Sequence, residues 1–244
     1  MVSTEKTLDI LDLFDLNDRA LTVAQISEKI KQPQSSVYRY VRLLRERDLL
    51  REERKGVYSL GYKMLKYYRI LRLDSNLAVI AEEEMKKLTS ELNETSILLV
   101  PSNLQAVCIA TVSSQHKIKV TSEPGEILPL YGGASSKSLL AYLDERVLES
   151  LYTKTEVLAY TENTITSLSE MKAHLQEIRN KGYAFSDSEI DESVVGYGVP
   201  IFDSNNTVVA SLSVAGLKDN MLKKDSKKIV QSLKETAEKI QKYL

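Results

Sequence analysis

The stretch covering residues 21–61 constrains the fold of this chain more than any other part of the sequence. Thr22 precedes Gln25 by three residues, the spacing at which a hydroxyl and an amide satisfy each other's backbone donors at a helix start. A second helix is expected from about Pro33, because a first helical turn tolerates proline. Residues 49–60 resemble two short strands around a turn that contains a glycine. Two helices followed by such a hairpin predict a winged helix-turn-helix.

The predicted second helix has two different faces. Val37, Val41 and Leu44 are spaced four and three residues apart, which places them in one apolar stripe. The opposite face is rich in Arg, Gln, Ser and Tyr; in a major groove Arg can pair with guanine, Gln with adenine, and Ser or Tyr with phosphates. We expect Arg39 and Arg42 to read bases, and the predicted turn and hairpin to position the backbone. The residues predicted to contact DNA are Thr22, Lys31, Gln34, Ser35, Ser36, Tyr38, Arg39, Arg42, Arg54 and Lys55.

Two other interpretations of this basic helix stay open. An Arg-rich face is in most proteins simply solvated, and a basic helix can also dock a protein or an RNA. The helix cap, the short turn between the helices and the hairpin together favour DNA. Charge agrees, because residues 1–72 hold 15 Lys and Arg against 10 Asp and Glu, whereas residues 73–244 hold 18 against 24. An excess of cations in the DNA-reading half is what phosphate neutralisation requires.

Composition narrows the class of protein. A chain of 244 residues with 43% hydrophobic residues can form two domains with cores of their own. Its one Cys cannot form an internal disulfide, no apolar run approaches the roughly 18 residues of a membrane span, and the N-terminus has no apolar signal region. We therefore expect a cytoplasmic protein without a membrane partner. The expected organisation is a DNA-binding domain over 1–61, a linker helix over 62–76 and a second domain over 77–244.

The sequence beyond residue 61 alternates between helical and strand-like patterns. Leu77, Ala81, Met85, Leu88 and Leu92 mark one amphipathic helix after the linker. Strands are expected at 96–100, 106–112, 117–121, 183–186, 194–201 and 207–214, and further helices at 135–143, 145–152, 168–181 and 225–243. Short strands and helices in this order predict an α+β domain with an antiparallel sheet.

Catalytic chemistry finds little support in the sequence. The two histidines, His116 and His174, do not stand at metal-ligand spacing from Cys108, which lies in an apolar run typical of a buried strand. No nucleophile-elbow pattern and no glycine-rich phosphate loop is present in the sequence. We therefore predict a protein that is not an enzyme and needs neither a metal nor a cofactor.

Motifs along nearly the whole chain resemble one family of bacterial regulators. In the first half they are Glu5-Lys6-Thr7-Leu8-Asp9-Ile10-Leu11, Leu21-Thr22-Val23-Ala24-Gln25-Ile26, Pro33-Gln34-Ser35-Ser36-Val37-Tyr38-Arg39 and Gly56-Val57-Tyr58-Ser59-Leu60-Gly61. In the second half they are Pro124-Gly125, Leu128-Pro129-Leu130, Ser136-Lys137, Ile178-Arg179-Asn180-Lys181-Gly182-Tyr183-Ala184, Val199-Pro200-Ile201-Phe202-Asp203 and Ala210-Ser211-Leu212-Ser213-Val214. In this order the motifs resemble the isocitrate-lyase-regulator (IclR) family of transcription factors.

The resemblance implies a specific architecture and mode of action. It implies an N-terminal winged helix, a linker helix and a C-terminal GAF-like effector-binding domain. It also implies a homodimer or homotetramer on a double-stranded DNA operator, controlled by a small organic effector. Repression is the expected mode, with activation left open. The alternative is an interaction module for protein or RNA without an effector.

The resemblance also places a ligand pocket in the second domain. Where members that sense small keto acids have Asp, Cys and Ser, this chain has Ser186, Gly196 and Ala215, and Tyr131 stands where a His is common. These changes remove polar partners and volume, so a larger, partly apolar or hydroxyl-rich ligand is expected. Ordinary strand and turn composition is the alternative explanation. The residues predicted to bind the effector are Leu128, Tyr131, Ala134, Ser135, Ser186, Asp187, Gly196, Ser213 and Ala215.

The predicted linker helix carries more aromatic surface than a solvated connector needs. Met64, Tyr68 and Leu71 fall on one side of it, and Tyr67 stands beside Tyr68. We therefore expect this helix to help pair two chains.

Overall fold

The computed structural model describes residues 3–74 and 76–244. Its internal contacts divide the chain into two compact units, Met1–Ser75 and Asn76–Leu244. Each unit has hydrophobic cores of its own. Ser75, where the sequence predicts a break between helices, lies outside the described residues.

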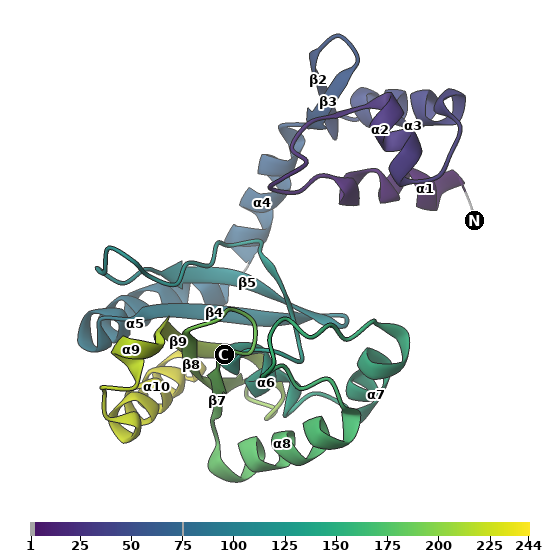
Figure 1. Ribbon diagram of the computed structural model, residues 1–244. Coiled ribbons are helices and arrows are strands. Elements are labelled where there is room, and N and C mark those ends of the chain that lie inside the picture. The colour runs from purple at the N-terminus through teal and green to yellow at the C-terminus, as the bar shows by residue number, and fades with distance from the viewer. Residues whose placement is uncertain (1–2, 75) are drawn as a thin grey trace. The chain divides into compact units, whose positions relative to one another are not determined.

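The N-terminal unit is a small helical domain with a three-stranded sheet (Figure 1). Ile10 and Leu21 are fully buried in its core together with Ile26 and Val37. Its elements in chain order are α1 Ser3–Asp9, a 3-10 turn Leu11–Leu13, β1 Leu21–Thr22, α2 Val23–Lys29, α3 Gln34–Glu46, β2 Leu50–Arg54, β3 Val57–Leu60 and α4 Lys63–Asp74.

The start of α2 confirms the capping pattern expected from the sequence. The Gln25 backbone N–H donates to Thr22 Oγ1 at 3.2 Å, and the Thr22 N–H donates to Gln25 Oε1 at 2.8 Å. Lys31 takes a left-handed φ of 52°, which turns the chain between the two helices. Pro33 then caps α3, as the sequence predicts.

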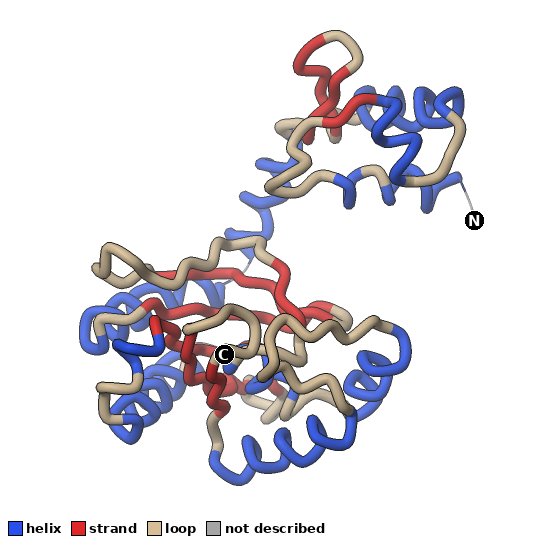
Figure 2. The backbone as a smooth tube through the Cα atoms, viewed as in Figure 1, coloured by secondary structure: helices blue, strands red, loops and turns tan. Residues whose placement is uncertain are grey.

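A hairpin follows α3 and forms the wing. Strand β3 lies between β1 and β2, and all neighbouring strands run antiparallel. Gly56 has a φ of 74°, which favours glycine, and its N–H donates to Glu52 Oε1 at 2.8 Å. Figure 2 shows the strands of this hairpin in red beside the helices of the unit. The predicted winged helix-turn-helix is therefore confirmed.

The C-terminal unit is built on one six-stranded sheet. The strand order is β6-β5-β4-β9-β8-β7, and every neighbouring pair is antiparallel, which confirms the predicted α+β class. Its elements are α5 Asn76–Leu92, β4 Thr95–Ser102, β5 Gln105–Val112, β6 Ile127–Pro129, α6 Ala134–Leu140, α7 Glu145–Lys154, α8 Leu168–Lys181, β7 Ala184–Asp187, β8 Val194–Phe202, β9 Val208–Leu217, α9 Lys218–Met221 and α10 Ser226–Gln241.

Helices cover both faces of this sheet. Helices α5 and α10 pack on one face, where Met85 and Leu233 meet Leu98 of β4. Helices α6, α7 and α8 cover the other face, where the core includes Ile97 and Leu99. Successive residues of a strand point to opposite faces, so β4 contributes to both cores in alternation.

One predicted strand is absent. Residues 117–121 form no strand and lie in an irregular connection, with a bend at 117–118, between β5 and β6. The place beside β5 is taken by β6, with Gln105 opposite Pro129, so the segment has no ladder partner. It is held instead by Thr95, whose hydroxyl donates to the Val120 carbonyl at 2.8 Å. This path brings Val120 to the edge of a cavity.

A candidate DNA-binding surface and a cavity in the C-terminal unit

The outer face of α3 is polar and accessible, as its sequence predicts. Val37, Val41 and Leu44 are buried in the core. Tyr38 on the other side is 56% exposed, and the Arg42 side chain is 81% exposed. Gln34, Ser35 and Arg39 are also exposed, whereas Ser36 is half-buried.

The arginines of α3 differ in the hydrogen bonds and ion pairs that they already form within the chain. Arg42 Nε donates to Glu46 Oε1 at 2.9 Å, and Arg39 donates to Ser36 Oγ at 3.2 Å. Both contacts are exposed, so DNA can replace them at small cost. Arg45, which the helical pattern puts on the same outer face, pairs with Glu52 of the wing at 3.1 Å and lies over the Tyr58 ring. Arg45 therefore ties α3 to the wing.

The remaining predicted DNA contacts fall in the turn, the cap and the wing. Lys31 is exposed in the turn between α2 and α3, and Arg54 and Lys55 are exposed at the end of the hairpin. The Thr22 hydroxyl is engaged with Gln25 in the helix cap. The cap of α2 therefore explains the presence of a hydroxyl at residue 22 without any contact to DNA.

A cavity of about 120 Å³ lies in the C-terminal unit, bordered by the start of α6, strands β4, β8 and β9, and the segments before β6 and after β7. Seven of the nine residues predicted to bind an effector line it. They are Leu128, Ala134, Ser135, Ser186, Gly196, Ser213 and Ala215. Residues from five strands (β4, β6, β7, β8 and β9), from α6 and from the connecting segments thus meet at one place.

The other two predicted pocket residues, Tyr131 and Asp187, do not line the cavity. Tyr131 is buried, its hydroxyl accepts the Leu158 N–H at 3.1 Å and its ring stacks on that of Tyr160. Asp187 pairs with Lys218 at 2.8 Å, and this hydrogen bond lowers the pKa of the carboxyl. Both side chains bind neighbouring loops. Their position in the sequence next to cavity-lining residues does not show this direction.

Small residues on β8 serve close packing more than ligand space. A Cβ at Gly198 would lie 2.6 Å from the Ala134 carbonyl oxygen, so α6 rests directly on this strand. A Cβ at Gly196 would lie 3.5 Å from the Cβ of Ala134 and 3.8 Å from that of Ala215. The cavity between these elements measures about 120 Å³.

Serine hydroxyls dominate the polar part of the cavity wall. Ser135 Oγ donates to Ser213 Oγ at 2.9 Å, and Ser213 donates to the Ile97 carbonyl. Ser136 and Ser186 are more than nine-tenths buried and also line the cavity. Within the described part of the chain, neither of these two hydroxyls has a hydrogen-bond partner.

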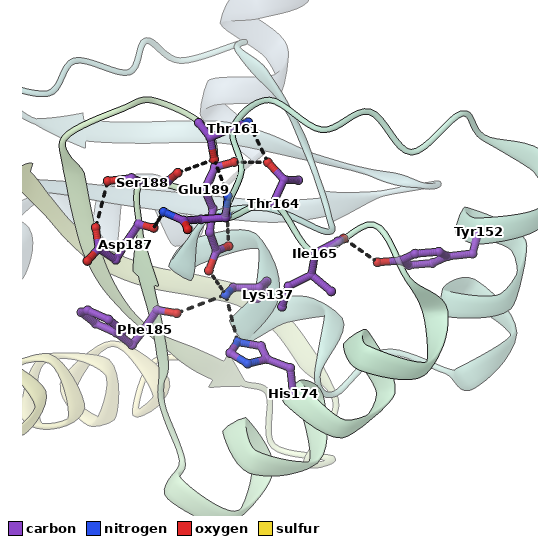
Figure 3. Close-up of polar contacts among 12 residues, drawn as sticks. Lys137, Tyr152, Thr161, Thr164, Ile165, His174, Phe185, Asp187, Ser188 and Glu189 are labelled. Atoms are coloured by element: carbon purple, nitrogen blue, oxygen red, sulfur yellow. Dashed lines mark hydrogen bonds and ion pairs between the residues drawn. The ribbon is translucent and has the colours of Figure 1, made fainter.

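A buried ion pair lies beside the cavity and was missed from the sequence (Figure 3). Lys137 is fully buried, and its Nζ donates to Glu189, to His174 Nε2 at 2.9 Å and to the Phe185 carbonyl at 3.1 Å. Burial lowers the pKa of Lys137, and the Glu189 charge partly offsets this. Burial and then the Lys137 charge lower the pKa of His174 to about 4, so its neutral ring accepts the hydrogen bond.

The segment that carries Glu189 is held by the connection between α7 and α8. Thr164 Oγ1 donates to the Glu189 carbonyl at 2.6 Å, and Thr161 Oγ1 donates to the Ser188 carbonyl at 2.5 Å. Figure 3 shows these threonines converging on the backbone beside Lys137. The Glu189 carboxylate is thereby placed between Lys137 and the cavity.

The cysteine and the possible metal ligands of the chain form no further candidate site among the described residues. Cys108 is buried in β5, and its Sγ lies 3.3 Å from Thr111 Oγ1. Across residues 3–74 and 76–244, no group of three or more His, Cys, Asp or Glu could hold a metal ion. In the same residues, no helix combines the length and apolar character needed to cross a bilayer.

Comparisons with known proteins agree over both units. Residues 3–54 match the IclR helix-turn-helix domain, and residues 73–242 match the bacterial transcriptional regulator IclR C-terminal domain. The transcriptional regulator KipR of Bacillus subtilis is 26% identical over 98% of this chain and 95% of its own length. The crystal structure of Thermotoga maritima IclR has a TM-score of 0.70 and 30% identity, covering 99% of this chain and 98% of its own.

A further likeness concerns the fold alone. An IclR homolog from Microbacterium hydrocarbonoxydans, solved with 4-hydroxybenzoate, has a TM-score of 0.83 at 20% identity, covering 99% of this chain and 98% of its own. Because the C-terminal family model alone spans most of the sequence, this chain belongs to the IclR family of transcription regulators and carries that family's helix-turn-helix DNA-binding domain.

Proposed function

We propose that the chain binds a double-stranded DNA operator through α3 and the wing, and that a small molecule in the C-terminal cavity modulates this binding. The observation that carries the proposal is a cavity in a different unit from the DNA-binding helix, on whose wall two serines, Ser136 and Ser186, have hydroxyls without a partner in the described chain. A serine hydroxyl that no protein group engages is free to donate and accept hydrogen bonds with a ligand in the cavity. A homolog of the same fold was solved with the small molecule 4-hydroxybenzoate, which supports a small-molecule ligand for this chain as well.

On DNA, the proposed roles follow from position. Arg39 and Arg42 on the outer face of α3 read base edges, whereas Lys31, Arg54 and Lys55 contact phosphates. One winged helix reads only a few base pairs, so useful specificity favours a homodimer or homotetramer on a palindromic operator. A ligand that binds one arrangement of the assembly more tightly then shifts its affinity for the operator.

Helix α4 is the proposed site of pairing between chains. Tyr62 before it and Leu65, Tyr68 and Leu71 within it are 72%, 64%, 46% and 68% exposed in one chain. An isolated, solvated helix gains nothing from such apolar exposure, whereas a second copy would bury it. Sedimentation of the full chain should give a dimer or larger species. A monomer at micromolar concentration that still binds DNA with full affinity would contradict this assignment.

Binding to nucleic acid is tested with an operator selected from a random duplex library. Fluorescence anisotropy should show tight binding to the selected duplex, weaker binding to random duplexes and a steep loss of affinity with salt. An RNA of the same sequence serves as the control. Equal affinity for the RNA, or for all duplexes, favours the interaction-module alternative instead.

The ligand site is tested with Gly196→Leu. The added side chain has to enter the cavity or displace α6, since the first carbon already lies in contact with Ala134 and Ala215. The response to a ligand should be lost while operator binding stays intact, because the reading helix belongs to the other unit. A variant that responds to the ligand like the parent protein shows that the cavity is not the site.

A further inference from the structure

A single carboxylate connects the DNA-reading helix to the wing. Glu52 Oε2 forms an ion pair with Arg45 Nη1 of α3 at 3.1 Å, and Glu52 Oε1 accepts the Gly56 N–H of the hairpin turn at 2.8 Å. The Arg45 guanidinium also lies 5.7 Å from the centre of the ring of Tyr58, the buried residue that is paired with Glu52 in the ladder. Helix α3, strand β2 and the turn are thus joined through one side chain.

The ladder of the hairpin is interrupted just before its tip. Strand β2 has an extra residue, Glu53, at a bulge where the register with β3 shifts. Beyond the bulge the ladder continues with the pair Arg54 and Val57 and then gives way to the turn. Figure 2 shows this tip, drawn in tan, extending beyond the helices of the unit. The position of the tip therefore depends on contacts other than the ladder.

The tip carries cations that are proposed to contact phosphates. Arg54 ends β2 and Lys55 lies in the turn, and both are exposed. A tip that moves freely has to be ordered when it binds DNA, which costs conformational entropy. The contacts of Glu52 with Arg45 and Gly56 fix the turn relative to α3 before DNA arrives. They therefore lower the cost of bringing the cations to the phosphates.

The neighbouring Glu53 provides an internal comparison. Its carboxylate pairs with Arg51 at 2.7 Å, a contact within β2. The Glu53 side chain is 40% exposed, whereas that of Glu52 is 28% exposed. Both carboxylates repel DNA phosphates, so charge alone gives them the same effect on binding. Glu52 differs because each of its oxygens contacts another element of the unit.

We infer that Glu52 is a positioning residue for DNA binding, which holds the tip of the wing where Arg54 and Lys55 meet the phosphates beside the bases that α3 reads. The inference rests on the proposed function, because it requires α3 and the wing to bind one duplex. A glutamine at this position has one acceptor oxygen, so it cannot accept from both Arg45 and the Gly56 N–H. Glu52→Gln therefore breaks one link at nearly constant side-chain size.

The first test compares two variants of the full chain that remove the same charge from adjacent residues. Loss of a carboxylate near phosphates by itself strengthens DNA binding, so Glu53→Gln should bind at least as tightly as the parent protein. Glu52→Gln should bind about two- to fivefold more weakly than this control, the range that a partly exposed ion pair contributes. The factor should be similar on the selected operator and on random duplexes, because phosphate contacts carry no sequence information.

A double-mutant cycle identifies which contact is lost. Arg54→Ala should weaken binding by the same factor in the parent protein and in Glu53→Gln. In Glu52→Gln the same substitution should cost about two- to fivefold less, because the tip is no longer held in place. A general loss of stability lowers affinity without this coupling. Thermal unfolding of each variant checks that both units remain folded.

Each outcome supports or overturns the inference. Weaker binding by Glu52→Gln, together with a reduced cost of Arg54→Ala, supports it. If Glu52→Gln binds as tightly as Glu53→Gln, or if Arg54→Ala costs the same factor in both, Glu52 does not position the wing. If Glu52→Gln binds more tightly than Glu53→Gln and loses affinity more steeply with salt, the carboxylate withholds Arg45 from DNA and the inference is wrong.

One further outcome concerns the proposed function itself. If Arg54→Ala has no effect in the parent protein while Arg42→Ala weakens operator binding, α3 binds DNA without the wing. The proposed phosphate contact then fails and the inference fails with it, whereas the role of α3 stands.

Discussion

The two units of this chain differ in one respect: beside its exposed ion pairs, the C-terminal unit also buries a cation. The N-terminal unit places its arginines on an exposed helix face and on a hairpin, where their ion pairs are accessible to solvent. The C-terminal unit buries Lys137 completely against Glu189. Exposed pairs contribute little to stability, so these cations remain available to a partner. Breaking a buried pair costs much free energy, so the Lys137–Glu189 pair fixes the local arrangement of the chain. Its buried lysine cannot contact DNA.

The largest expected effect comes from breaking the buried pair. Lys137→Met leaves the Glu189 carboxylate without its cation in a buried site. We expect a loss of about 3–5 kcal/mol in the free energy of unfolding. Urea denaturation measures it. The matched control is Lys172→Met, which removes an exposed pair with Glu145 and should cost at most about 1 kcal/mol. Similar losses in the two variants would remove the contrast between buried and exposed ion pairs.

The second effect is a pH dependence that belongs to the buried cluster. The folded state keeps His174 neutral to about pH 4, whereas the unfolded chain takes up this proton near the ordinary pKa of 6.5. The unfolded state therefore binds more protons between these values, and stability falls as the pH is lowered from 6.5 to 4. The loss from this residue is at most about 3 kcal/mol at pH 4, because the ring is partly exposed.

The variant His174→Gln isolates this contribution. Glutamine can still accept the hydrogen bond from Lys137 through its amide oxygen, but it does not titrate. Urea denaturation at several pH values from 7 to 4 gives the free energy of unfolding at each pH. Its decrease over this range should be much smaller in this variant than in the parent protein. An unchanged decrease would mean that His174 is not the group responsible.

The third effect concerns the exposed cations. Arg42→Ala should weaken operator binding by about 1–3 kcal/mol if the guanidinium reads a guanine. The stability of the chain should stay nearly constant, since the pair with Glu46 is exposed. Arg54→Ala in the wing is the control, and it should weaken binding to operator and random duplexes alike. An equal loss on both DNAs for Arg42→Ala would refute base reading.

The smallest expected effect tests whether Thr22 acts in the cap of α2 or contacts DNA. Its hydroxyl accepts the Gln25 N–H in the cap of α2. Thr22→Ala should therefore lower the stability of the N-terminal unit by about 1 kcal/mol. Thermal unfolding measures this loss. The variant Thr22→Ser keeps the cap and should retain most of the stability. A loss of operator affinity in Thr22→Ala that exceeds its loss of stability, and that Thr22→Ser restores, would instead assign this hydroxyl to DNA.

Much of the N-terminal unit was predictable because its determinants are local. The cap of α2, the proline before α3 and the glycine of the hairpin each act within a few residues. The faces of α3 followed from helical periodicity alone. Arg45 is the exception, because its pairing with Glu52 depends on how the hairpin folds back on the helix.

The C-terminal unit was predictable in its elements and less so in its cavity. Most expected strands and helices are present, whereas residues 117–121 form an irregular connection because β6 occupies the place beside β5. Tyr131 and Asp187 were expected in the cavity but are used in loop packing. Their neighbours in sequence do line it, so adjacency alone was a poor guide to side-chain direction.

The sequence by itself determined the family, the winged helix and most of the strands and helices, because periodicity, caps and motifs are written in neighbouring residues. Only the tertiary structure decided the size of the cavity and the ion pair beside it. The hydrogen-bonding partners Lys137 and Glu189 are 52 residues apart, and Gly133 and Glu189 are 56 apart. Such contacts arise from the packing of α6 on the sheet, which no local pattern encodes.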